Sequence, residues 1–248
     1  MNKTIDHLSY SACRTFLTSP SKFEKCYING EQLPFPLVMA EGKAWHKGLE
    51  MFFTRPENYI GDALQELTDT KDEIQDFDEE EFQIVGERLE ENLIVYKEEF
   101  ADRNWKDNQY VEMKVSKIPS PIEGGLPLTA QMDLVDNKGN PVDHKYVGVY
   151  SIGNGYEHYV QAWFYYWATQ NLTGKFPEYF VLSEFKKTKN RDKNPQLQDT
   201  VILYDQKWID KVSEWYRQVS LMVQNQTYYP INPFKNFDNE DWQAYLAD

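Results

Sequence analysis

Two short apolar runs joined by a four-residue turn constrain the fold of this chain more than any other feature. Residues 128–136 (LTAQMDLVD) and 141–149 (PVDHKYVGV) are rich in Leu, Val, Thr, Tyr and Met. The segment between them, 137–140 (NKGN), has the Asn and Gly residues typical of a hairpin turn. The sequence therefore predicts two neighbouring antiparallel strands.

The predicted hairpin carries charged side chains that can meet at one point. Side chains at i and i+2 share a face of a strand, so Asp143 and Lys145 project together while His144 points away. The turn pairs the neighbourhood of Asp143 with that of Asp133. Mg²⁺ usually takes one or two carboxylates plus waters and substrate phosphate, and a lysine beside it can position the attacking water. The hairpin thus has the groups of a metal site for phosphodiester cleavage, although an isolated Asp-x-Lys pair is more often solvated surface.

Four further motifs accompany the Val142–Lys145 strand in a fixed order. They are an L-S-Y-S-x-C-x-x-F segment at 8–16, Gly42-Lys43-Ala44-Trp45-His46, Ala130-Gln131-Met132-Asp133, and Gln161 followed four residues later by Tyr165. This series resembles the PD-(D/E)XK nuclease superfamily, and within it the RecB-type branch that includes RecB and AddB nuclease domains and phage and CRISPR-associated exonucleases. Ala130 stands where the family often has Gly, and Tyr146 stands where a Thr often follows the lysine.

The resemblance implies a mixed α/β fold, in which a restriction-endonuclease-like central mixed sheet is flanked by helices. It implies a metal-dependent deoxyribonuclease, an exonuclease or recombination nuclease more than a site-specific restriction enzyme. The roles that it assigns are metal ligation by His46, Asp133, Asp143 and the backbone carbonyl of His144, action on the nucleophilic water by Lys145, and support of the site or substrate by Gln161 and Tyr165.

The two flanking motifs also have interpretations of their own. Residues 40–53 have helical spacing and place His46 one turn from Glu50, which also suits a helix-surface or partly buried histidine. Imidazole is a softer donor than Mg²⁺ prefers, so Mn²⁺ is expected to serve as well or better. In the aromatic run 156–169, Gln161 and Tyr165 share a helix face, and a buried amide needs hydrogen-bond partners that a site supplies. Packing against the sheet is the alternative for Tyr165.

The charge balance does not exclude a nucleic-acid enzyme. The chain has 26 basic and 40 acidic residues, a net charge of −14, but much of the acidity lies in 72–103, which predicts a long helix with a solvated outer face. Glu112, on a predicted strand at 110–115, is either a further site carboxylate or, by preference, a solvent-facing residue. The basic segment at 185–194 is expected to be a loop that either contacts the DNA backbone or is a solvent-facing hairpin tip without a function. The candidate DNA contacts are Lys186, Lys187, Lys189 and Arg191.

The organisation along the chain is continuous, and we expect a single nuclease domain over 1–248. Its expected parts are a mainly helical segment at 1–105, an αβ core at 106–225 and a tail at 226–248. The expected elements outside the motifs are helices at about 9–27, 60–67 and 206–224 and strands at 179–185 and 200–204.

Composition bounds the remaining expectations. Cys13 and Cys26 are too few for a disulfide scaffold or for the iron-sulfur cluster of some RecB-type nucleases, so no cluster is expected. No apolar stretch approaches the ~18 residues of a membrane span, and Met1–Asp6 lacks a signal-peptide core. We expect a cytoplasmic protein, encoded by a bacterium or a phage, with DNA as its partner; a recombinase or annealing partner and an oligomer are left open.

Two other functional classes remain in view. A nuclease-fold subunit that binds DNA or protein without catalysis would be expected to lose the lysine or a carboxylate, and both are present. An unrelated α/β protein in which the motifs coincide by chance predicts that Asp133, Asp143 and Lys145 point to different places.

Overall fold

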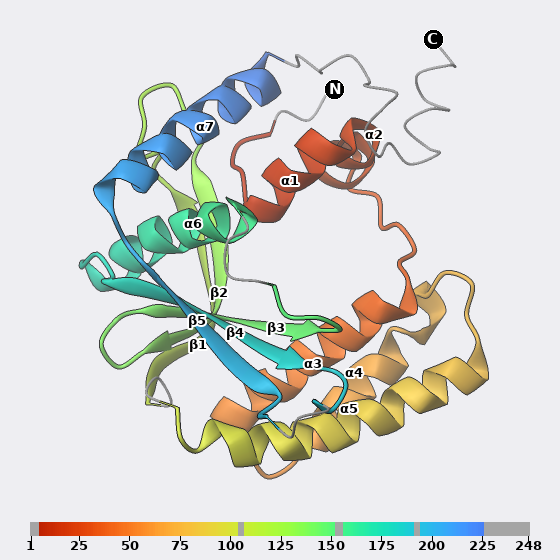
Figure 1. Cartoon of the computed structure of the whole chain (residues 1–248). Coiled ribbons are helices and arrows are strands. Elements are labelled where there is room, and N and C mark those ends of the chain that lie inside the picture. Colours follow the sequence, from red (N-terminus) through yellow and green to blue (C-terminus); the bar gives the residue numbers. More distant parts are fainter. Residues whose placement is uncertain (1–4, 104–106, 152–155, 191–193, 226–248) are drawn as a thin grey trace.

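The computed structural model describes residues 5–103, 107–151, 156–190 and 194–225, around a five-stranded sheet of order β1-β2-β3-β4-β5 (Figure 1). Its strands are β1 (Asn108–Ile118), β2 (Leu128–Asp136), β3 (Pro141–Val147), β4 (Tyr179–Lys186) and β5 (Leu197–Leu203). Neighbouring strands are antiparallel except β3 and β4, which are parallel. The predicted mixed α/β class is confirmed.

The β2–β3 hairpin forms where the sequence predicts it. Leu134 pairs with Val142 and Val135 with Pro141, a register that places Asp143 opposite Asp133. Gly139 adopts a φ of 87°, a conformation that favours glycine, and Asp136 Oδ1 accepts the backbone N–H of Asn140 at 2.7 Å. The turn therefore fixes the register that brings the two carboxylates together.

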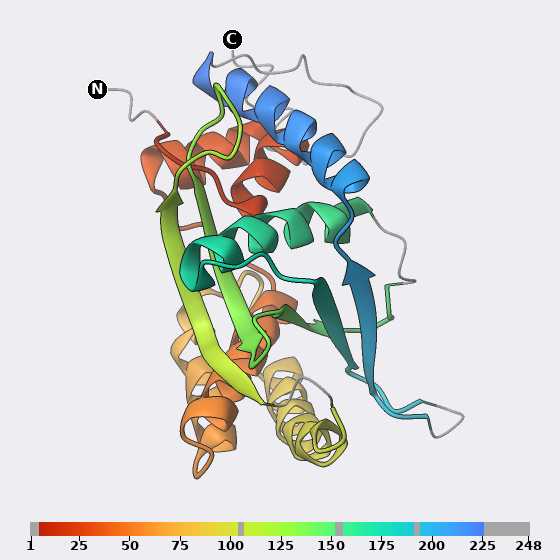
Figure 2. The same ribbon diagram turned by 90° about the vertical axis from the view of Figure 1, so that its left-hand side faces the viewer.

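Helices cover both faces of the sheet (Figures 1 and 2). On one face lie α1 (Tyr10–Thr18), α6 (Tyr156–Thr173) and α7 (Gln206–Gln224); on the other lie α3 (Leu37–Thr54), α4 (Tyr59–Asp69) and α5 (Glu79–Phe100). Each face buries its own core. Trp163, Phe164 and Phe180 belong to the first core, and Trp45 and Tyr96 belong to the second. The β3 strand, between the two cores, is thereby held on both sides.

The first predicted helix, at about 9–27, is interrupted in the structure. α1 ends at Thr18, and α2 (Pro20–Phe23) begins with Pro20 at its first position. Proline has no N–H to donate and its ring clashes with the preceding turn, so it starts a helix but does not continue one. A π-helical turn (Glu24–Asn29) follows and ends at Gly30, whose φ is 75°.

The acidic helix is shorter than predicted, because it begins at Glu79 and not at 72. A 3₁₀ turn (Lys71–Glu73) comes first, and Ile74 then forms a parallel bridge with Phe35. The Asp78 side chain accepts the backbone N–H of Glu81 at 2.8 Å, which caps the start of α5. The acidic run therefore divides between a turn and a helix.

The later elements follow the predicted order, with β5 starting three residues earlier than expected, at Leu197. The tail at 226–248 lies outside the described residues. Among the helices that the structure describes, none combines the length and the apolar character needed to cross a membrane.

Candidate active site

Five elements bring the candidate site together. β2 supplies Asp133, β3 supplies Asp143 and Lys145, α3 supplies His46, and α6 supplies Gln161 and Tyr165. β1 adds Glu112, because the β1–β2 register places it opposite Asp133. The residues that the sequence singled out for the chemistry are thus brought to one region from distant parts of the chain, and they do not point to different places.

Asp143 is a buried carboxylate, 1% exposed, surrounded by hydrogen-bond donors. Its Oδ1 accepts from Gln161 Nε2 at 2.7 Å and from the Tyr165 hydroxyl at 3.0 Å. Its Oδ2 lies 2.7 Å from Lys145 Nζ, since residues i and i+2 of a strand share a face. Gln161 and Tyr165 reach one acceptor because positions i and i+4 of α6 lie on the same helix face. We call these four residues the donor cluster.

A second group lies beside the donor cluster and consists of His46, Glu112 and Asp133. One ligand atom from each lies within 4.8 Å of the others. His46 Nδ1 is 3.6 Å from Asp133 Oδ2, and Gln131 Nε2 donates to Glu112 Oε2 at 2.8 Å. One imidazole and two carboxylates suit a hard or borderline divalent cation such as Mg²⁺ or Mn²⁺. We call this group the acidic cluster.

The electrostatics of the acidic cluster fit a bound cation. Burial, and then the charge of Asp143, raise the pKa of Asp133 to about 8. Burial and the charge of Asp133 raise the pKa of Glu112 to about 7. Burial, followed by the positive charge of Lys145, lowers the pKa of His46. Carboxylates that resist ionisation beside a neutral imidazole gain from a divalent cation, which replaces the protons and removes the repulsion.

Lys145 remains charged in this setting. Burial alone lowers the pKa of its ammonium group, but the carboxylates of Asp143 and Asp133 outweigh it and the net shift is upward. At neutral pH Lys145 is therefore a hydrogen-bond donor and not a base.

His144 faces the other side of β3, as the strand alternation predicts. Its Nε2 lies 3.1 Å from the Tyr96 hydroxyl of α5, and burial lowers its pKa to about 3, so the ring stays neutral. Its backbone N–H donates to Asp133 Oδ2 at 2.7 Å. His144 thus orients a carboxylate of the acidic cluster through its main chain, while ligation by its carbonyl stays a prediction.

An aromatic pair holds α3, which carries His46, against β3, which carries Lys145. Trp45, which precedes His46, stacks on Tyr146, which follows Lys145, with ring centroids 4.4 Å apart and planes at 7°. Trp45 is fully buried. Tyr146, the departure from the usual Thr, therefore packs α3 against β3 at the level of the site.

The four basic residues predicted to contact DNA have different surroundings. Lys187 Nζ bonds to the buried carboxylate of Glu41 and lies 4.7 Å from the centre of the Tyr146 ring, with 10% of its side chain exposed. Its ammonium group is therefore engaged by Glu41 and Tyr146 inside the protein. Lys186 donates to Asn190 Oδ1 at 3.0 Å, Lys189 is exposed, and Arg191 lies outside the described residues.

Two residues near the site are not identified well by the sequence: it favours a solvent-facing position for Glu112, and it indicates no role for Gln131. Glu112 fits an alternating strand whose polar face is solvated, and its φ of 47°, unusual for a non-glycine residue, has no sequence signature. Gln131 stands next to Met132 in the Ala130–Asp133 motif, and its bond to Glu112 depends on the β1–β2 register, which the sequence does not give.

Comparisons with known proteins identify the family and a similar fold. The family model of the PD-(D/E)XK nuclease superfamily matches residues 7–237. A solved structure from Eubacterium rectale, described as a "putative exonuclease", is similar over 96% of this chain and 93% of that one, with a TM-score of 0.60 and 14% identity, a likeness that concerns the fold. The structure of SSO0001 covers 87% of this chain and 88% of that one at 13% identity and a TM-score of 0.34, too low to carry an argument. The search of curated proteins finds no match.

Proposed function

The chain belongs to the PD-(D/E)XK nuclease superfamily, and from that premise we propose that it is a divalent-metal-dependent DNA exonuclease. One observation carries the proposal. The acidic cluster of His46, Glu112 and Asp133 adjoins a charged lysine that Asp143 holds at 2.7 Å. A cation beside a fixed ammonium group can activate water and stabilise the charge that develops on a phosphodiester during hydrolysis.

The residues that would hold the cation are His46, Glu112 and Asp133, with Asp143 beside them. When bound, Mg²⁺ or Mn²⁺ supplies an acidified water and neutralises charge on the phosphoryl oxygens. Asp143 holds Lys145 so that its N–H groups can donate to the attacking water or to a phosphoryl oxygen. Gln161 and Tyr165 in turn hold Asp143, which fixes the lysine before the substrate arrives.

Digestion of end-labelled linear DNA and of closed circular DNA with Mg²⁺ or Mn²⁺ tests the proposal. We expect the linear substrate to disappear and the circular substrate to survive. Cleavage of the circle would refute the exonuclease assignment while supporting a nuclease. No cleavage of either substrate with either metal would refute the proposed activity and favour a nuclease-fold binding subunit.

A further inference from the structure

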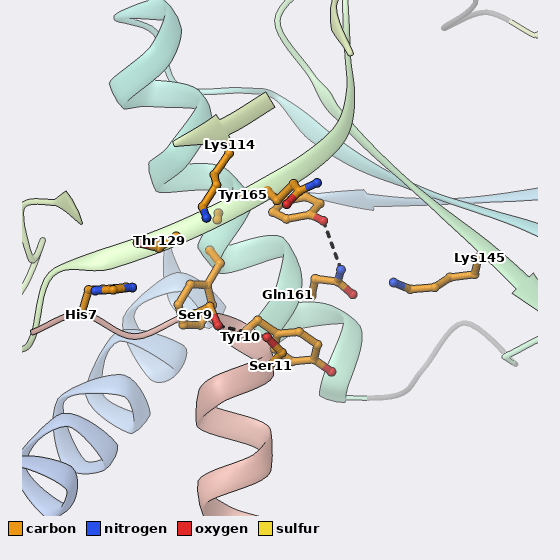
Figure 3. A pocket seen from close by; sticks show the side chains of 12 residues that line it. His7, Ser9, Tyr10, Ser11, Lys114, Thr129, Lys145, Gln161 and Tyr165 are labelled. Carbon is orange, nitrogen blue, oxygen red and sulfur yellow. Dashed lines mark hydrogen bonds between the residues drawn. The ribbon is translucent and has the colours of Figure 1, made fainter. Parts of the chain in front are cut away.

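A pocket of about 480 Å³ opens beside the donor cluster (Figure 3). Lys145, Gln161 and Tyr165 line one part of it, and the start of α1 and the neighbouring strands β1 and β2 line the rest. The remaining lining residues are His7, Ser9, Tyr10, Ser11, Lys114, Thr129, Ala130, Gln131 and Phe164. A volume of this order is that of a small-molecule site.

The pocket has the opposite charge balance from the chain. Its lining includes Lys114 and Lys145 and no aspartate or glutamate among the described residues, whereas the chain has 40 acidic and 26 basic residues. No carboxylate pairs with Lys114 in the described part of the structure, and this side chain is exposed at the pocket. Because Lys145 is already paired with Asp143, it is Lys114 whose charge can attract an anion into the pocket.

The hydroxyl groups of α1 add a directed donor. Ser9 Oγ accepts the backbone N–H of Ala12 at 3.1 Å and lies 3.0 Å from Ser11 Oγ. Either hydroxyl can be the donor in the Ser9–Ser11 contact, and in the arrangement in which Ser9 donates, the Ser11 O–H is left for an acceptor in the pocket. Lys114 and Ser11 thus offer a charged and a neutral donor to one ligand.

Residues that line the pocket also contact the acidic cluster and belong to the donor cluster. Gln131 lines it and donates to Glu112 of the acidic cluster at 2.8 Å, while Lys145 lines it and binds Asp143. The rings of Tyr10 and Phe164, in edge-to-face contact at 6.4 Å, give it an apolar wall suited to a sugar or base. A ligand in the pocket therefore lies beside Lys145 and beside the proposed cation site.

We propose that this pocket binds the nucleotide next to the scissile bond, with its phosphate held by Lys114 and Ser11. The inference rests on the proposed nuclease function and adds a substrate contact to it. The shared chemistry is a phosphate ester, which is either an internal diester of the strand or a monoester at its end.

The test compares Lys114→Ala and Ser11→Ala with Lys138→Ala, which removes the same charge as the first variant from the exposed β2–β3 turn. Binding of a fluorescent single-stranded oligonucleotide is measured by anisotropy with Ca²⁺ in place of Mg²⁺, over a series of salt concentrations. Lys114→Ala is expected to weaken binding about 5- to 50-fold and to reduce the salt slope by about one unit. Ser11→Ala weakens it less, and Lys138→Ala leaves it within twofold.

Oligonucleotides with and without a phosphate at each end distinguish the two sources of the ester. An effect of Lys114→Ala only on a phosphorylated end identifies the monoester, and an effect on every oligonucleotide identifies the diester; both support the pocket. Equal effects of Lys114→Ala and Lys138→Ala would overturn it. Because the readout is binding, it stands even if the wild-type protein cleaves nothing, so failure of the pocket and failure of the nuclease function are distinguishable.

In cleavage assays the same variants separate substrate contact from structural damage. Lys114→Ala should raise KM with kcat within about twofold, and the dissociation constant for Mn²⁺ alone should not change. A fall in kcat and in Mn²⁺ affinity at constant KM would contradict a role in holding substrate.

Discussion

The donor cluster and the acidic cluster differ in how their charges are balanced. Asp143 has an amide, a hydroxyl and an ammonium group around it, so its charge is stabilised inside the protein. Asp133 has one backbone N–H and a repelling neighbour, and its pKa is raised to about 8. The surrounding donors thus balance the charge of Asp143, whereas Asp133 lacks a balancing charge, which the proposed cation would supply. The difference indicates that the fold alone positions Lys145, whereas the charge balance of His46, Glu112 and Asp133 depends on the proposed cation.

The largest effect should come from removing the lysine. Lys145→Met is expected to lower kcat by about 10²–10³-fold, because a preorganised donor to the reacting groups is lost. Mn²⁺ binding, measured by calorimetry, should change by less than about fivefold, since Lys145 is no ligand. Lys138→Met is the matched control. Equal loss of kcat and of metal affinity would mean that the two clusters are not separable.

Neutralising the two aspartates should have opposite effects on the stability of the metal-free protein. Asp133→Asn removes a buried charge that its surroundings disfavour, and is expected to raise the free energy of unfolding by about 1–3 kcal/mol at pH 8 while metal binding is lost. Asp143→Asn removes an anionic acceptor from three donors and should lower that free energy by about 1.5–3 kcal/mol.

Urea unfolding in the presence of a chelator measures both variants. Destabilisation by Asp133→Asn as large as that by Asp143→Asn would contradict the distinction between the clusters. Added Mn²⁺ should stabilise the wild-type protein and leave the Asp133→Asn variant unchanged.

The raised pKa of Asp133 also predicts a pH dependence. The folded state holds a proton on Asp133 up to about pH 8, whereas an unfolded aspartate loses it near pH 4. This group's contribution to stability is therefore fully present below about pH 4 and is lost as pH rises toward 8. The wild-type protein should lose stability relative to Asp133→Asn over this range, as measured by thermal unfolding with a chelator. Mn²⁺ affinity should rise over the same range, because the cation displaces protons.

The sequence predicts the site better where local geometry decides the position. The alternation of a strand places Asp143 with Lys145, and a helix turn places Gln161 with Tyr165; both pairs are found at one carboxylate. The place of Glu112 in the site depends on strand pairing and on a positive φ, and the ion pair of Lys187 with Glu41 joins distant segments. No local sequence pattern encodes either. The N-terminal helix is shorter than the predicted 9–27 because Pro20 interrupts it, although the apolar spacing continues past this residue.

The smallest effect should come from the Tyr165 hydroxyl. Tyr165→Phe removes one of the donors to Asp143 Oδ1 but keeps the ring against Phe180, with centroids 5.7 Å apart. Gln161 Nε2 still donates at 2.7 Å, so Asp143 keeps its position and kcat should fall only about 5- to 30-fold, the equivalent of a hydrogen bond to a charged group worth about 1–2 kcal/mol. Tyr166→Phe, a partly exposed neighbour on the same helix, is the control and should have no effect. A loss as large as that of Lys145→Met would mean that Tyr165 contacts the reacting phosphate itself, and the donor cluster would then bind substrate as well as hold the lysine.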